Sequence, residues 1–232
     1  MYVIINVKIM KKILLSVLLV AMLAPMAMAV DMGGFRFGLK ASPSVAWLRP
    51  ETSGYEHDGV RLGFSYGFIG DVALGDFYAF STGLNINIIG GKLMYPELLS
   101  PTDPPVDMSR NYNLQYLEIP LTIKMHTQEI GYLTYYGRFG FGAGVNLRSK
   151  SKDSYNNVTI EQDDIKSETR LLRASLIVGL GVEYSLGGKT ALVGGVTFNN
   201  GFTNVLKGTN EALNRKPSAI NNFLELTFGI MF

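Results

Sequence analysis

The sequence lacks cysteine altogether and contains only two histidines, His57 and His126. The absence of cysteine excludes a disulfide framework and a lipid-modified N-terminal cysteine. With no thiol and so few imidazole ligands, we expect no metal site and no cofactor. The formal net charge of +2 is too small to indicate a nucleic-acid partner.

Long apolar runs are also scarce, and the first lies at the N-terminus. The lysine-rich segment 8–12 precedes an apolar run over residues 13–24, and the small-residue segment 27–29 (AMA) follows. This order predicts a cleavable signal peptide over residues 1–29, with Met10 as an alternative start. A retained anchor helix is the competing interpretation, although the run is short for a membrane span. Beyond residue 29 no segment offers about 18 uninterrupted apolar residues, so we expect no transmembrane helix there.

Glycine and aromatic residues are abundant, with 26 Gly, 12 Tyr and 13 Phe, a mixture that favours strands. The last ten residues, FLELTFGIMF, alternate strictly between apolar and polar or small residues. Segments of about ten residues that are apolar on one face only are typical of outer-membrane β-barrels. The terminal Phe232 resembles the C-terminal signal that the outer-membrane assembly machinery recognises, so we expect that machinery as a partner.

Eight segments with this period-two alternation follow one another in residues 30–232. We expect strands over residues 35–47, 60–73, 77–90, 111–126, 131–148, 170–186, 190–202 and 219–232. In the fifth, Phe139, Phe141 and Val145 share one face, while Gly140 and Gly142 share the other. The predicted fold is therefore an all-β, eight-stranded, antiparallel, up-and-down transmembrane barrel in a single domain of residues 30–232.

The connections alternate in length, as expected of a barrel in the outer membrane of a Gram-negative bacterium. Tight periplasmic turns are predicted near residues 74–76, 127–129 and 187–189, and long polar extracellular loops after the odd-numbered strands. Lipid and lipopolysaccharide are therefore expected as surroundings. Aromatic residues near the predicted strand ends indicate two membrane girdles: Trp47, Tyr95, Tyr112 and Phe202 outside, and Phe35, Phe77, Tyr78 and Tyr132 inside.

One strand carries a family resemblance. The segment 116–124, YLEIPLTIK, resembles a strand motif of the PorT-like outer-membrane β-barrel family. With the signal peptide, the glycine-rich fifth strand and Phe232, the resemblance covers essentially residues 30–232. It implies an integral outer-membrane barrel and, for the founding member, a part in protein secretion across that membrane.

Alternation also places a set of charged side chains inside the barrel. They are Arg36, Lys40, Arg61, Asp71, Glu118, Lys124, Arg138, Arg173, Glu183 and Glu225. Eight strands leave an interior just wide enough for side chains to fill, so we expect ion-paired packing, with a narrow channel or small-solute transporter as the alternative. A tight turn near Gln128 predicts that Glu118 pairs with Arg138.

Two predicted loops have unusual compositions. The segment 91–110 is stiffened by four prolines and carries Leu93, Leu98 and Leu99, which form either a docking patch for a protein partner or packing across the barrel mouth. The segment 149–169 is rich in charged residues, among them Asp153 and Glu168, and is expected to be a solvated loop, with cation or lipopolysaccharide bridging as the alternative.

No catalytic site is predicted. The glycines of segment 140–144 lie at period two inside a strand, whereas a nucleotide-binding loop opens a helix. Glu56, His57 and Asp58 are adjacent in a loop, which is a weak basis for a rim enzyme because no nucleophile is specified. The sequence therefore favours a structural or interaction protein that acts through its extracellular loops and has a link to secretion.

Overall fold

The computed structural model describes residues 34–100, 104–156 and 158–232. The chain divides into two compact units, residues 1–35 and residues 36–232, and the second is the barrel. The predicted signal peptide lies outside the described residues. Among those residues no helix is long and apolar enough to cross a membrane.

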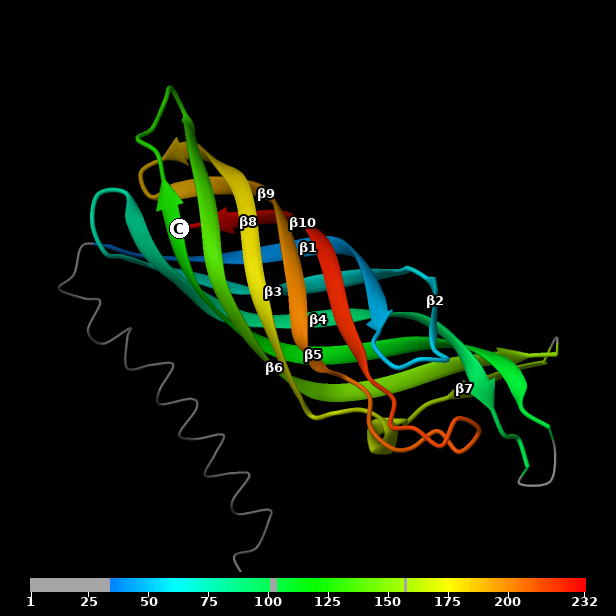
Figure 1. Ribbon diagram of the computed structural model, residues 1–232. Helices are drawn as coiled ribbons and strands as arrows, with labels where there is room; N and C mark the ends of the chain where they lie inside the picture. The colour runs from blue at the N-terminus through cyan, green and yellow to red at the C-terminus, as the bar shows by residue number, and fades with distance from the viewer. Residues whose placement is uncertain (1–33, 101–103, 157) are drawn as a thin grey trace, which may run out of the picture. The chain divides into compact units, whose positions relative to one another are not determined.

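Eight strands form the barrel, as predicted. They are β1 (Phe35–Pro50), β3 (Arg61–Ala73), β4 (Tyr78–Glu97), β5 (Val106–His126), β6 (Leu133–Tyr155), β8 (Leu172–Gly187), β9 (Thr190–Asn204) and β10 (Ala219–Met231). Each strand pairs with the next, and β1 pairs with β10 to close the sheet (Figure 1). Three short elements complete the described part: β2 (Glu56–Gly59), β7 (Val158–Gln162) and the 3-10 helix η1 (Lys166–Glu168).

The alternation of the sequence separates the two faces of the barrel wall, because successive side chains of a strand point to opposite sides. In β6 the outward side chains Phe139 and Phe141 are exposed, while Gly140 and Gly142 face inward. In β10 Leu224 and Phe228 are exposed, whereas Glu225 is buried. The barrel thus has an apolar outer surface and a polar interior, which is the arrangement that a lipid bilayer requires.

The strands reach much further at one end than the sequence indicated. We call this the outer end; it lies opposite the C-terminus (Figure 1). There β4 continues to Glu97, β5 begins at Val106 and β6 continues to Tyr155. The interpretation of segments 91–110 and 149–169 as loops is therefore wrong over most of their length, because their polar residues pair across strands, as Arg110 does with Asp153.

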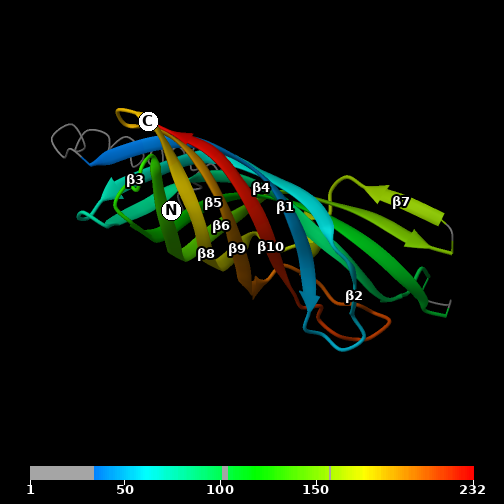
Figure 2. The same cartoon turned by 90° about the horizontal axis from the view of Figure 1, so that it is seen from above.

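Two short strands join these extensions at the outer end. β2 pairs with β4, and β7 pairs with β6. We call the resulting order β2-β4-β5-β6-β7 the outer sheet. Figure 2 shows β2 and β7 at this same end of the barrel. The connections of the barrel thus build a folded extension of it.

The turn between β5 and β6 is longer than predicted. It spans residues 127–132, contains an Ile130–Leu133 bridge, and has Gly131 in the left-handed region with a φ of 69°. The register therefore places Glu118 opposite Gly144 and Arg138 opposite Lys124. The predicted Glu118–Arg138 pair is wrong, because the centre of the turn is displaced by about three residues from Gln128.

An apolar cluster fills the interior at the outer end. Its central members are the fully buried Leu48, Leu93, Leu114, Tyr116 and Phe223. Ile165, next to η1, and Val205, after β9, pack against them from the connecting segments. This cluster, here called the apolar plug, covers the polar interior at its outer end.

Candidate functional site

The charged residues of the barrel interior form ion pairs that join strands across the lumen. Lys124 on β5 lies between two carboxylates: its Nζ is 2.6 Å from Asp71 Oδ2, and it also donates to Glu183. Glu183 in turn accepts from Arg36 Nη1 at 2.6 Å. This inner group therefore ties β1, β3, β5 and β8 together.

Three further ion pairs lie in the interior. Lys40 Nζ is 2.8 Å from Glu225 Oε1, and Arg138 Nη2 is 3.7 Å from the same oxygen. Arg173 Nη1 is 3.0 Å from Glu118 Oε2. Of the ten charged residues assigned to the interior, Arg61 has an amide rather than a carboxylate as partner: it donates to Asn111 Oδ1 at 3.2 Å.

The space left among these side chains is small. A cavity of about 20 Å³ lies beside Lys40, Glu118, Arg138 and Glu225. A water molecule needs roughly 10–15 Å³ on this measure, so the cavity has room for one or two. Buried charges are tolerated because they are paired, and the pairs fill the lumen. This arrangement can hold the barrel wall together.

A much larger cavity, of about 350 Å³, lies at the outer end. We call it the outer pocket. Its lining combines aromatic, apolar and charged residues: Tyr55, Tyr95, Glu97, Leu98, Leu99, Met108, Arg110, Tyr112, Glu168, Leu206, Lys207, Gly208, Thr209, Asn210 and Pro217. Concave sites of roughly 300–1,000 Å³ with such mixed linings are the usual form of small-molecule sites.

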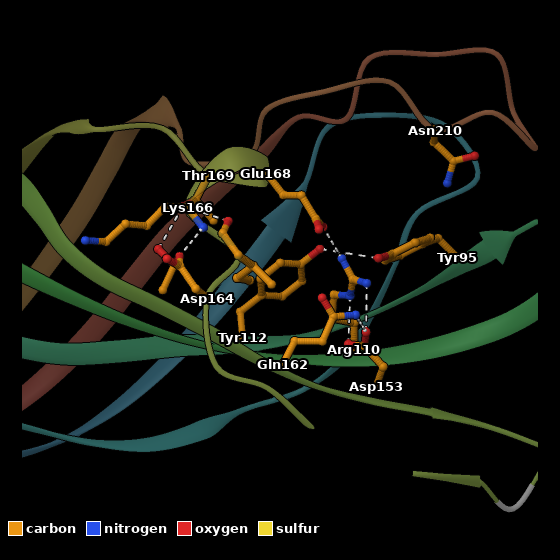
Figure 3. A network of polar contacts seen from close by, with 12 residues as sticks. Tyr95, Arg110, Tyr112, Asp153, Gln162, Asp164, Lys166, Glu168, Thr169 and Asn210 are labelled. Atoms are coloured by element: carbon orange, nitrogen blue, oxygen red, sulfur yellow. Dashed lines mark hydrogen bonds and ion pairs between the residues drawn. The ribbon is translucent and has the colours of Figure 1, made fainter. Parts of the chain in front are cut away.

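Arg110 organises the charged side of the outer pocket (Figure 3). Its Nε and Nη2 donate to the two carboxylate oxygens of Asp153 at 2.8 and 2.7 Å, and its Nη1 donates to Glu168. Gln162 on β7 donates to Asp153 at 2.8 Å. A bidentate guanidinium–carboxylate pair fixes both distance and angle, so this network sets the position of β5 against β6, β7 and η1.

Tyrosine side chains form the aromatic side. The rings of Tyr55 and Tyr95 stack with centroids 4.4 Å apart, and the hydroxyls of Tyr95 and Tyr112 are 3.5 Å apart. Burial raises the pKa of Tyr55 to about 12, so its hydroxyl stays protonated at neutral pH. The prediction that Tyr95 and Tyr112 belong to a membrane girdle is wrong, because both are only 3% exposed and pack in the apolar plug.

The leucines of the predicted docking patch are separated by the structure. Leu93 is fully buried in the apolar plug, so its assignment to an exposed patch is wrong, and it packs across the barrel mouth instead. Leu98 and Leu99 line the outer pocket. Sequence reasoning missed the ion network of Arg110 because it began the fourth strand at residue 111. The alternation of Met108, Arg110 and Tyr112 extends that strand towards the N-terminus.

The acid–imidazole segment does not form a catalytic arrangement. His57 Nδ1 lies 3.1 Å from the main-chain oxygen of Leu48, whereas Asp58 accepts from the Ser109 hydroxyl. Adjacent residues of a strand point to opposite faces, so the imidazole and the Asp58 carboxylate have separate partners. Within the described residues, no group of three or more His, Asp or Glu side chains is placed to hold a metal ion.

Comparison with known proteins identifies the family. A family model described as an outer membrane protein beta-barrel domain matches residues 25–207, and the chain belongs to this family. It is accordingly a protein of the Gram-negative outer membrane. No curated protein sequence matches the chain.

The solved structures that are similar to this chain are distant in sequence. Neisserial surface protein A is 14% identical, with 86% of this chain and 96% of that chain covered and a TM-score of 0.46. OprG from Pseudomonas aeruginosa is 11% identical, with coverages of 86% and 96% and a TM-score of 0.44. Ail from Yersinia pestis is 12% identical, with coverages of 87% and 100% and a TM-score of 0.38.

Proposed function

We propose that this member of the outer membrane protein beta-barrel family is a non-catalytic interaction protein that acts through its extracellular part. One observation carries the proposal: the lumen is filled, whereas the strands continue beyond the barrel into the folded outer sheet. Ten interior charges and the apolar plug occupy the route through the barrel. The outer end instead presents a sheet and a pocket of about 350 Å³.

The same observation disfavours the narrow channel that the charged lumen suggested. A conducting lumen needs charges that exchange partners with a passing ion. Here Lys124 contacts two carboxylates and Arg173 is 2% exposed. The interior cavity of about 20 Å³ holds one or two waters and does not amount to a pore.

A link to protein secretion is part of the proposal, and the resemblance of segment 116–124 to PorT-like barrels supports it. The segment lies on β5, where Tyr116 is fully buried in the plug and Lys124 is in the inner ion group. Because these side chains pack inside the barrel, the motif supports assignment to a type of barrel and does not identify a contact with a partner protein. We infer that any secretion partner binds at the outer end or at the periplasmic turns.

Site-specific photo-crosslinking in cells tests the proposal. A photoreactive residue at Thr159, exposed on β7 of the outer sheet, should capture a second protein. The same residue at Phe141, exposed on the lipid-facing side of β6, is the matched control and should capture lipid only. If positions throughout the outer sheet crosslink no protein and secreted proteins leave a deletion strain normally, the interaction role is refuted.

A further inference from the structure

We propose that the outer pocket binds an organic cation, a small ligand that carries an ammonium group on an apolar body. This inference rests on the proposed function of the extracellular part and adds the chemistry of the ligand. The inference is based on the volume of the pocket, on its tyrosine and leucine walls, and on a carboxylate in its lining that has no hydrogen-bond partner among the described residues.

The walls select an apolar body of moderate size. The cavity of about 350 Å³ is bordered by Tyr55, Tyr95 and Tyr112 and by Leu98, Leu99 and Leu206. Because Tyr55 and Tyr95 stack on each other, each can offer a ligand only the ring face that points away from the other tyrosine. Tyrosine faces carry partial negative charge and attract ammonium and guanidinium groups. Arg110 already makes such a cation–π contact, because its guanidinium carbon lies 6.0 Å from the centroid of the Tyr112 ring.

Two donor side chains of the lining, Arg110 and Asn210, are already occupied. Arg110 donates to both oxygens of Asp153 and to Glu168, which leaves it little capacity to hold an anion. The side-chain amide of Asn210 donates to the Tyr55 hydroxyl at 3.1 Å and to the Pro96 carbonyl at 2.9 Å. A ligand that needs donors, such as a phosphate or a carboxylate, finds few of them here; Lys207 is exposed and offers one.

One acceptor of the lining, in contrast, is free. Glu97 lines the pocket, and within the described part of the chain its carboxylate has no hydrogen bond or ion pair. Burial raises the pKa of Glu97, and the carboxylates of Glu168 and Glu211 raise it further, although Arg110 opposes this. An ammonium group beside Glu97 would supply the missing partner and relieve the repulsion among these carboxylates. Charge-assisted hydrogen bonds of this kind are stronger than neutral ones.

Three probes of similar size and different charge test the inference on the full-length protein refolded in detergent. Isothermal titration calorimetry at pH 7 should show that 2-phenylethylamine binds at least tenfold more tightly than 2-phenylethanol or phenylacetate. Replacement of Glu97 by Gln keeps the shape of the side chain and removes its charge. E97Q should weaken binding of the amine by roughly ten- to a hundredfold, as expected for loss of one charged hydrogen bond.

The control variant is Glu161→Gln, on β7 outside the pocket lining, which should bind the amine like the unchanged protein. Equal binding of amine and alcohol, preferential binding of the acid, no binding, or unchanged affinity in E97Q would each overturn the inference. A closed barrel resists detergent until it is boiled, so a gel mobility that changes on heating shows that each variant is folded. Protein crosslinks at Thr159 without amine binding would refute the cation site alone, whereas absence of crosslinks throughout the outer sheet, together with normal secretion in a deletion strain, would refute the proposed function.

Discussion

Arg173 and Glu118 form an ion pair across the barrel interior, with Nη1 of the arginine 3.0 Å from Oε2 of the glutamate. The two residues lie on β8 and β5, which are separated by β6 in the wall. Arg173 Nη2 also donates to Asn199 Oδ1 at 2.6 Å and to the main-chain oxygen of Asn221 at 3.0 Å. One guanidinium thus connects β5, β8, β9 and β10.

Removal of one partner of this pair should destabilise the barrel strongly. Arg173→Leu or Glu118→Leu leaves the other charge buried and unpaired, at a cost of about 3–5 kcal/mol, whereas the double change should cost much less. Urea-dependent refolding in detergent measures the three free energies. Together these three variants form a double-mutant cycle. The same cycle between Glu118 and Arg138 should show a much smaller coupling energy, because Arg138 pairs with Glu225. The reverse ranking would contradict the register between β5 and β6.

Two glycines of β6 should respond differently to the same small change. A Cβ atom on Gly142 would lie 2.7 Å from Ser175 Oγ and 3.0 Å from Glu118 Cδ, whereas one on Gly144 would meet its nearest atoms at 3.6 Å. Gly142→Ala should therefore destabilise the barrel by about 1–3 kcal/mol through overpacking, and Gly144→Ala should be nearly neutral. Unfolding midpoints in urea check this, and equal effects at the two positions would argue against close packing around Glu118.

The purified protein should show no large conductance in planar bilayers. The ion pairs fill the lumen beneath the apolar plug, so removal of residues 151–162 from the outer sheet should not create a conducting pore either. Single-channel recording with a known porin as positive control makes the measurement. Stable porin-like steps from the unchanged protein would contradict the filled lumen and favour the transport alternative.

Phe232 should matter more for assembly in cells than for the stability of the finished barrel. Its main chain exchanges two hydrogen bonds with Phe37, and its ring lies 5.4 Å from the Phe37 ring. Phe232→Ala keeps the main-chain bonds, so the variant refolded in detergent should still show heat-dependent gel mobility. In cells the amount in the outer membrane should fall several-fold, whereas Phe228→Ala, an exposed change in the same strand, should have little effect on that amount.

The strands could be predicted from the sequence because their period of two is imposed by the bilayer outside and the polar lumen inside. At the outer end this constraint disappears, and the strands continue through Arg110 and Asp153, residues whose polarity is typical of loops. The centre of the turn after β5 was predicted at Gln128, but it lies three residues later, at Gly131, which has a positive φ.

The candidate site was only partly accessible from the sequence. Alternation determines which face a side chain occupies, but Arg173 reaches Glu118 across a non-adjacent strand, which depends on the stagger of the closed barrel. Pro120, in contrast, could be interpreted from the sequence: proline lacks a main-chain N–H, which predicts a bulge or a local break in the strand pairing. The β4–β5 pairs pass from Thr82–Leu121 to Asn85–Glu118 without a bulge, so the local break is confirmed, and the Thr82 hydroxyl donates to the Pro120 carbonyl at 2.8 Å.

The continuity of β4, β5 and β6 from the barrel into the outer sheet has a mechanical consequence. These strands are 20, 21 and 23 residues long, and they run from one end of the molecule to the other without an intervening hinge. A pull on a partner held at the outer sheet is transmitted along the strand axes, so it loads many interstrand hydrogen bonds at once in shear. Tension applied to a partner bound at the outer sheet would therefore be distributed over the barrel wall.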